Sequence, residues 1–264
     1  MKKQISITLT LIAALLQSAC GDIGDNPAFG IDDSATGSTT STASRVPSQT
    51  NFALLFSDFQ LDAIDQDTRV FQEQSTDITV VVADKDGVPI ENQLVNIATD
   101  WGLSEPSCIT DADGRCTVGW TTSAFSDAFP NYLYFSYCVR VVAYTTGEEP
   151  FYDDNGNNVF DASDAASFYG NLFDFSNGYI DVPEPYFDRN RNGFFDDATD
   201  GVINTDSAGV DGHDAGDGLF NGADCDAGAL CSPNTTTTIW TAGYIDLKDE
   251  TVAAVPAAAN TCTY

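Results

Sequence analysis

From residue 51 onward, apolar positions gather in short segments that are separated by polar turn residues. None of these segments keeps a helical period, and β-branched and aromatic side chains dominate them. This pattern predicts antiparallel strands at residues 52–56, 78–83, 94–99, 116–122, 132–144 and 237–245. Gly87 and Gly114 each close an Asp-rich tetrapeptide between two such segments, and glycine supplies the positive φ of a tight turn. The pattern therefore predicts an all-β fold.

Several motifs between residues 75 and 145 resemble the bacterial Ig-like domains of invasin and intimin type. Residues 79–89 combine a strand with Asp-Lys-Asp-Gly-Val-Pro, and residues 110–118 combine Thr-Asp-Ala-Asp-Gly with the start of another strand. The resemblance implies a β-sandwich with a stalk or adhesion role and no catalytic residues. We therefore expect an Ig-like β-sandwich built from residues 51–146 plus 235–264. Residues 147–234 would form a loop-rich insertion before the last strand.

The first 19 residues have the features of a secretory signal, with a charged start, a short apolar run and small residues before a cleavage point. Residues 16–20, Leu-Gln-Ser-Ala-Cys, resemble the lipobox of bacterial lipoproteins, which implies that Cys20 is lipidated and anchors an exported chain to a membrane. Ordinary cleavage, with Cys20 as a plain thiol, is the alternative. Gly21 follows Cys20, which by the same resemblance implies the outer membrane. Residues 20–50 are small and polar, as in a flexible tether.

The charge of the chain excludes one class of partner. It has 40 Asp and Glu residues against 10 Lys and Arg residues, a formal net charge of −30. Nucleic-acid binding depends on clustered positive charge, so we expect no nucleic-acid partner. His213 is the only histidine, which excludes a His-rich metal or haem site. Adaptation of the surface to salt or solubility is an alternative explanation for acidic residues outside the clusters described next.

Six cysteines remain after Cys20, an even number in a chain that we expect to be exported. This favours three disulfides formed in an oxidising compartment. Sequence proximity suggests two of them, and the third pair is what remains: Cys108 with Cys116, Cys225 with Cys231, and Cys138 with Cys262. A metal-thiolate site is the rival interpretation, but the sequence contains no Cys-x-x-Cys spacing.

An acidic region with an internal repeat follows the predicted strand at 132–144. Residues 149–161 and 184–196 are identical at seven of thirteen positions, and each copy places oxygen-bearing side chains at loop positions one, three, five and nine. This spacing suits a hard cation, with the carbonyl of position seven completing the shell. The copies resemble the EF-hand-like calcium loops of dockerins. The first loop would use Asp153, Asn155, Asn157, the Val159 carbonyl, Asp161 and Asp164. The second would use Asp188, Asn190, Asn192, the Phe194 carbonyl and Asp196, with Asp197 or Asp200 in place of Thr199 at position twelve.

Two weaker copies of the pattern complete the predicted cation sites. One would use Asn177, Asp181 and Glu184 around Gly178, and the other Asp217, Asn221 and Asp224 around Gly218. Calcium is favoured over magnesium because the donors are numerous and flexibly placed. Solvated Asn-Gly and Asp-Gly turns are the alternative. The aromatic pairs at residues 151–152 and 186–187 are expected to form a small satellite core, although exposed aromatics would stack on a sugar.

These features predict a lipid-anchored, calcium-stabilised Ig-like protein of the cell surface that acts as a stalk, spacer, adhesin or assembly subunit. The expected partners are the membrane, through the anchor, and a protein or glycan at the surface, with self-assembly as a further alternative. A carbohydrate-binding module is the main alternative function. A carboxylate-based hydrolase is disfavoured, because no Gly-x-Ser-x-Gly, His-Glu-x-x-His or phosphate-binding Gly loop is present. The sequence leaves open whether the insertion packs on the sandwich.

Overall fold

The computed structural model describes residues 45–61, 63, 72–122, 138–166, 177–203, 213 and 215–247, all within the compact unit Thr42–Tyr264. The expected signal segment, Cys20, most of the tether and Cys262 lie outside the described residues. In the part of the chain that is described, no helix is long and apolar enough to cross a membrane.

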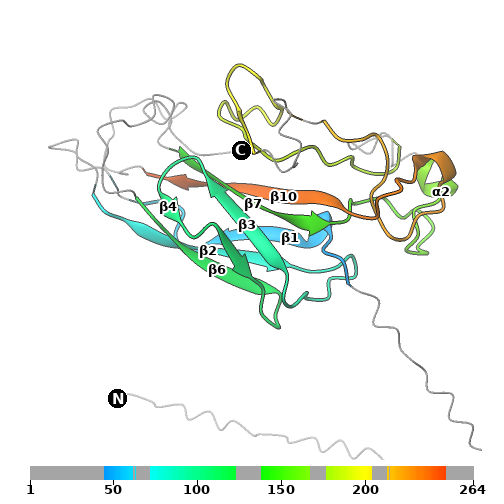
Figure 1. The fold of residues 1–264 in the computed structure, drawn as a ribbon, viewed down its shortest axis with the longest axis horizontal. Helices are drawn as coiled ribbons and strands as arrows, with labels where there is room; N and C mark the ends of the chain where they lie inside the picture. The colour runs from blue at the N-terminus through cyan, green and yellow to red at the C-terminus, as the bar shows by residue number, and fades with distance from the viewer. Residues whose placement is uncertain are drawn as a thin grey trace, which may run out of the picture. The chain divides into compact units, whose positions relative to one another are not determined.

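Two four-stranded antiparallel sheets pack face to face (Figure 1). The first sheet has the strand order β1 (Phe52–Phe56), β2 (Ser75–Val82), β6 (Arg115–Thr121) and β4 (Leu103–Ser104). The second has the order β10 (Thr237–Asp246), β7 (Cys138–Gly147), β3 (Leu94–Thr99) and β5 (Ser107–Ile109). In chain order these correspond to the ABED and GFC sheets of an immunoglobulin sandwich, with β5 added at one edge. The predicted Ig-like β-sandwich is confirmed.

Alternating side chains of the two sheets fill the core. Ile78, Val80 and Val82 point inward from β2 and are fully buried. Trp120 points inward from β6, and its indole N–H donates to the Trp101 carbonyl at 3.0 Å, so the large ring is buried without an unsatisfied donor. Strand β7 differs because nearly all of its residues are buried, on both faces. A strand with two buried faces must be covered on the side away from the core.

The regular strands agree with the sequence prediction. β1 and β3 match at both ends, and β2, β6 and β10 match within three residues. Of the predicted strand at 132–144, residues 132–137 lie outside the described residues, and β7 continues to Gly147. The remaining elements were not predicted, because an element of two to four residues is too short to show a periodic pattern. They are β4, β5, β8 (Tyr186–Phe187), β9 (Gly201–Val202), α2 (Ala162–Ala165), η1 (Gln49–Asn51) and η3 (Gly228–Leu230).

The sandwich begins inside the segment that we assigned to the tether. The backbone N–H of Ser48 donates to the Ala83 carbonyl at 3.0 Å. The Gln49 side chain donates to the Trp240 carbonyl at 2.7 Å and accepts from the Trp240 N–H at 2.9 Å. Gln49 therefore satisfies backbone groups of β10, which is an edge strand of its sheet.

The two predicted Asp-Gly turns are confirmed. The Asp84 carboxylate accepts from the N–H groups of Asp86 and Val88, and the Asp111 carboxylate accepts from those of Asp113 and Arg115. In both turns one carboxylate oxygen holds its own backbone, as expected for an Asx turn.

The turn at Asp111 does not join two paired strands of one hairpin. β5 pairs with β3 in one sheet, whereas β6 pairs with β2 in the other, so the chain crosses between the sheets here. The predicted Cys108–Cys116 disulfide is confirmed, and it links the two sheets.

The two turn glycines predict different responses to substitution. Both have a positive φ, of 76° at Gly87 and 68° at Gly114, but a Cβ at Gly87 would meet nothing within 4 Å. A Cβ at Gly114 would lie 2.3 Å from the Val82 carbonyl oxygen. We expect Gly87→Ala to lower the free energy of unfolding by about 1 kcal/mol. Gly114→Ala should lower it by roughly 2–4 kcal/mol, because steric overlap adds to the backbone strain. Denaturant titration of both variants tests this, and equal losses would contradict it.

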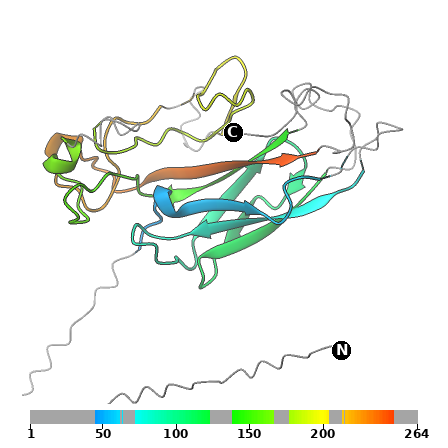
Figure 2. The same ribbon diagram turned by 180° about the vertical axis from the view of Figure 1, so that it is seen from behind.

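The insertion packs on the sandwich. Residues 180–203 run along the outer side of β10 and β7 in both ribbon views, whereas the part around α2 lies beyond the ends of these strands (Figures 1 and 2). The Trp240 indole N–H donates to the Pro183 carbonyl at 2.8 Å, and the Tyr186 ring meets the Trp240 ring edge-on with centroids 5.2 Å apart. This cover explains why β7 is buried on both faces.

Candidate functional site

The two predicted calcium loops have the same conformation, beginning with the carboxylate at position one. We call residues 153–164 loop A and residues 188–200 loop B. The Asp153 carboxylate accepts from the N–H groups of positions four, five and six, which are Gly156 (2.7 Å), Asn157 (3.2 Å) and Asn158 (2.8 Å). The Asp188 carboxylate accepts from the corresponding N–H groups, which are Arg191 (2.5 Å), Asn192 (3.3 Å) and Gly193 (2.9 Å).

The side chains at positions three, five and nine converge in each loop. In loop A the amides of Asn155 and Asn157 donate to the Asp161 Oδ2 atom at 2.9 and 3.0 Å. In loop B the amides of Asn190 and Asn192 donate to the Asp196 Oδ2 atom at 2.6 and 2.7 Å. In each loop the structure therefore brings together three of the side chains that the sequence assigned to cation binding.

The carboxylate after position nine closes each loop, and the structure resolves the choice between Asp197 and Asp200. Asp164 accepts from the N–H groups of positions two and nine, Asp154 at 2.8 Å and Asp161 at 2.9 Å. Asp200 accepts from the equivalent groups, Arg189 at 2.8 Å and Asp196 at 2.9 Å. Asp200 is therefore the counterpart of Asp164, and loop B is one residue longer than loop A.

The backbone repeats as well. Position six has a positive φ in both loops, 62° at Asn158 and 79° at Gly193, and the chain turns sharply there. Position four also has a positive φ, 73° at Gly156 and 60° at Arg191, which was not predicted. The N–H groups of Val159 and Phe194 donate to the amide oxygen at position five, at 2.7 and 2.8 Å. The ligand role of the Val159 and Phe194 carbonyls stays a prediction.

Hydrogen bonds favour the ionised form of Asp161. The hydroxyl and backbone N–H of Ser163, followed by the amides of Asn155 and Asn157, lower the pKa of this carboxyl below its ordinary value. Asp161 also caps helix α2 in a capping box with Asp164, which is completely buried. A charged carboxylate at position nine is the form that a cation needs.

Calcium itself stays a prediction for loops A and B. Across the described ranges, no three His, Cys, Asp or Glu side chains gather closely enough to hold a metal between them. In both loops the amides of positions three and five donate through nitrogen to the position-nine carboxylate. Calcium accepts amide and carboxylate oxygens together with carbonyls and water.

The two weaker copies of the pattern do not form two separate loops. Asp181, from the first copy, accepts from the N–H of Gly218, in the second copy, at 2.8 Å. The Glu184 carbonyl oxygen is hydrogen-bonded to His213 Nε2 at 2.9 Å. The Asp224 carboxylate, from the second copy, pairs with Lys85 Nζ at 2.5 Å. The Asn177 side chain hydrogen-bonds Tyr179, two residues before Asp181.

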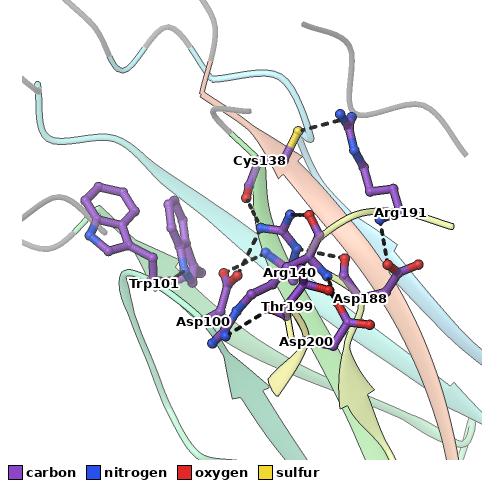
Figure 3. Close-up of polar contacts among 10 residues, drawn as sticks. Asp100, Trp101, Cys138, Arg140, Asp188, Arg191, Thr199 and Asp200 are labelled. Carbon is purple, nitrogen blue, oxygen red and sulfur yellow. Dashed lines mark hydrogen bonds and ion pairs between the residues drawn. The ribbon is translucent and has the colours of Figure 1, made fainter. Parts of the chain in front are cut away.

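A buried arginine of the sandwich holds the first residues of loop B (Figure 3). The Arg140 guanidinium, on β7, pairs with the Asp100 carboxylate at 3.1 Å, and their side chains are 2% and 1% exposed. It also donates to the carbonyls of Cys138 (3.0 Å), Asp188 (2.9 Å) and Arg189 (2.5 Å). Burial raises the pKa of Asp100, and the positive charge of Arg140 opposes this rise. Sequence reasoning missed Arg140, although a lone charge in a predicted buried strand signals a specific partner.

The insertion has a satellite core, which includes Phe151 but none of Tyr152, Tyr186 and Phe187 from the predicted aromatic pairs. Phe160, Tyr179 and Phe220 are buried together, and Phe151 packs against them. Tyr186 is 7% exposed and meets Trp240, Phe195 and His213 edge-on. These rings are used in packing, whereas Tyr152 and Phe187 are half-buried and Phe194 is exposed.

Of the remaining predicted disulfides, Cys225–Cys231 is confirmed and closes a small loop beside the satellite core. Cys138 is also in disulfide form, but its predicted partner Cys262 lies outside the described residues. The Cys138–Cys262 pairing stays a prediction.

Comparison with known proteins adds little to this picture. No family model matches the sequence, and no curated protein matches it significantly. Among solved structures, the chain is similar to the C-terminal 282-residue fragment of intimin in complex with the intimin-binding domain of the translocated intimin receptor. The two are 21% identical, with a TM-score of 0.25, and the match covers 34% of this chain and 26% of the intimin fragment. The fold assignment therefore rests on the strand order.

Proposed function

We propose that this protein is a calcium-stabilised Ig-like module that is lipid-anchored at a bacterial cell surface and has a structural or adhesive role. The observation that carries the proposal is that loops A and B share the same conformation and hydrogen bonds. Two segments that are far apart in the chain repeat the same hydrogen bonds, position for position, around the side chains that a hard cation requires. The shared arrangement supports a common role for the two segments.

The charge of the insertion supports a bound cation. Between Asp153 and Asp226 the sequence has 16 Asp residues and one Glu residue against only Arg189 and Arg191. Such a density repels itself unless positive charge is bound. Calcium ions in loops A and B would offset the repulsion and hold the insertion rigidly on β7 and β10.

The surface location is supported by the sequence features at the start of the chain. The lipobox-like residues 16–20 would anchor the protein through Cys20, and the polar segment that follows would hold the sandwich a short distance from the membrane. A rigid β-sandwich on such a tether suits a spacer, an adhesin or a subunit of a larger assembly.

Isothermal titration of the purified protein with calcium tests the proposal. We expect heat from binding to loops A and B after removal of bound ions with a chelator. The Asp111→Ala variant is the control, because Asp111 only holds its own turn and should leave the binding heat unchanged. Absence of binding heat in the wild-type protein would contradict the proposal.

Within loop B, two neighbouring carboxylates provide a matched pair of variants. Asp200 takes the role of Asp164, whereas Asp197 accepts no hydrogen bond that belongs to the shared pattern. We expect Asp200→Ala to weaken calcium binding to loop B at least tenfold, about 1.4 kcal/mol, because it removes both a charge and the closure of the loop. Asp197→Ala should change the affinity less than threefold. The same titration measures both, and equal effects would refute the assignment of Asp200.

A further inference from the structure

Three pairs of packed aromatic rings in the insertion hold equivalent positions relative to a loop. In loops A and B, a ring two residues before position one packs on the ring at position eight, with centroids 5.7 Å apart for Phe151–Phe160 and 5.6 Å apart for Tyr186–Phe195. The Tyr179 and Phe220 rings form a third such pair at 5.9 Å. By the same counting, position one of a third loop is Asp181 and position nine is Asn221.

This third loop is interrupted. Its positions one and two are Asp181 and Val182, and its position three is Ala215. The residues between them in the chain include loop B. We call Asp181, Val182 and residues 215–221 loop C. Gly216 and Gly218 then fall at positions four and six, and they have positive φ values of 103° and 73°, as the same positions have in loops A and B.

The hydrogen bonds of loop C repeat those of loops A and B. The N–H of position six, Gly218, donates to the Asp181 Oδ2 atom at 2.8 Å, and the equivalent distances are 2.8 Å in loop A and 2.9 Å in loop B. The N–H of position seven, Leu219, donates to the side chain of position five, Asp217, at 2.8 Å. The equivalent bonds are 2.7 and 2.8 Å.

Glu149 supplies the carboxylate that closes loop C, although it precedes the whole loop in the chain. Its two carboxylate oxygens accept from the N–H groups of Val182 and Asn221, each at 2.8 Å. These are positions two and nine, the groups that Asp164 and Asp200 hold in the other loops. Glu149 is 3% exposed, and burial raises its pKa to about 7, an effect to which the charges of Asp181 and Asp217 add.

An independent observation at position nine points to a ligand. In loops A and B, two amide groups donate to the position-nine carboxylate, but loop C has Ala215 and Asp217 at the positions that would provide them. Asn221 is 5% exposed, and its Oδ1 atom is buried and accepts no hydrogen bond from any residue that the structure describes. Leaving a buried oxygen without a partner costs about 1–3 kcal/mol, and a cation would remove this penalty.

We propose that loop C and Glu149 form a third calcium site. The carboxylates of Asp181, Asp217 and Glu149 do not gather around one point among the described residues, and the ion would draw them together with the Asn221 oxygen as its ligands. The inference rests on the proposed function of loops A and B, because the shared positions identify the ion. It also departs from them, since Glu149 gives loop C the position-twelve glutamate of a full EF-hand loop. The ion would tie residue 149, where the insertion begins, to residues 181 and 215–221, which enclose loop B.

Native mass spectrometry of the full chain in calcium tests the proposal by counting bound ions. We expect three ions on the wild-type protein and two on the Glu149→Gln variant. Asp217→Ala is the second variant, because Asp217 is exposed and its loss should leave the fold intact while removing the same ion. Asp224→Asn is the matched control and should keep three ions, since Asp224 pairs with Lys85.

The outcomes separate this inference from the proposed function. If the wild-type protein binds two ions, and Asp153→Ala and Asp188→Ala each remove one, loops A and B bind calcium and the third site is refuted. If the wild-type protein binds no ion, both proposals fail. Retention of three ions by both Glu149→Gln and Asp217→Ala would overturn the ligand assignment.

Discussion

The Arg140→Met protein is expected to unfold with a free energy about 3–5 kcal/mol lower than that of the wild-type protein. The substitution keeps an unbranched, flexible side chain but leaves the Asp100 carboxylate buried without its cation. It also removes the donors to the carbonyls of Asp188 and Arg189, which hold the start of loop B on the sandwich. Chemical denaturation followed by tryptophan fluorescence measures the change.

Two further variants make this prediction specific. Arg115→Met replaces an exposed arginine on β6 and should change the free energy of unfolding by less than about 0.5 kcal/mol. The double variant Arg140→Met with Asp100→Leu removes the buried charge as well, and should recover part of the loss because no charge stays buried without a partner. The recovery should be incomplete, since the carbonyls stay without donors and the backbone N–H of residue 140 loses the Asp100 carboxylate as its acceptor. A loss below 1 kcal/mol for Arg140→Met alone would show that the pair does not anchor the insertion.

Removal of calcium by a chelator is expected to destabilise the protein by roughly 5 kcal/mol through loops A and B. At a dissociation constant on the order of 10 μM and about 1 mM calcium, the hundredfold excess stabilises the folded state by about 2.7 kcal/mol for each site. Thermal unfolding with and without EDTA measures this. The melting temperature should fall by many degrees, since about 1 kcal/mol corresponds to roughly 2–4 °C in a domain of this size.

The variant with both Asp153→Ala and Asp188→Ala provides the control for the chelation experiment. It lacks the position-one carboxylate of both loops, so EDTA should lower its melting temperature much less than that of the wild-type protein. Equal melting temperatures of the wild-type protein in calcium and in EDTA would contradict the role of calcium in stability.

The sequence predicted the strands and the two loops because both depend on local spacing. Alternation along β1, β2, β3, β6 and β10 records which side chains face the core, and it does so within a few neighbouring residues. Loops A and B were predicted for the same reason, since positions one to nine are contiguous in both copies. The disulfides Cys108–Cys116 and Cys225–Cys231 join residues that are close in sequence.

The features that the sequence analysis missed depend on contacts between distant segments. The extra residue before Asp200 cannot be recognised from spacing, because only the backbone bonds to Arg189 and Asp196 identify the closing carboxylate. Arg140 meets loop B after a long separation in sequence. Asp224 follows the loop pattern in the sequence, but Lys85 lies beside it in the fold and pairs with its charge.

The sequence by itself determined the β-sandwich, its turns and the ligand spacing of loops A and B, because short-range periodicity and steric limits act within a few residues. Only the tertiary structure decided that the insertion packs on β7 and β10, that Arg140 holds loop B, and that Glu149 and Asp181 join residues 215–221. The physical reason is that these contacts form where segments far apart in the chain come together. Their partners are set by burial and charge in the folded protein, which no local pattern encodes.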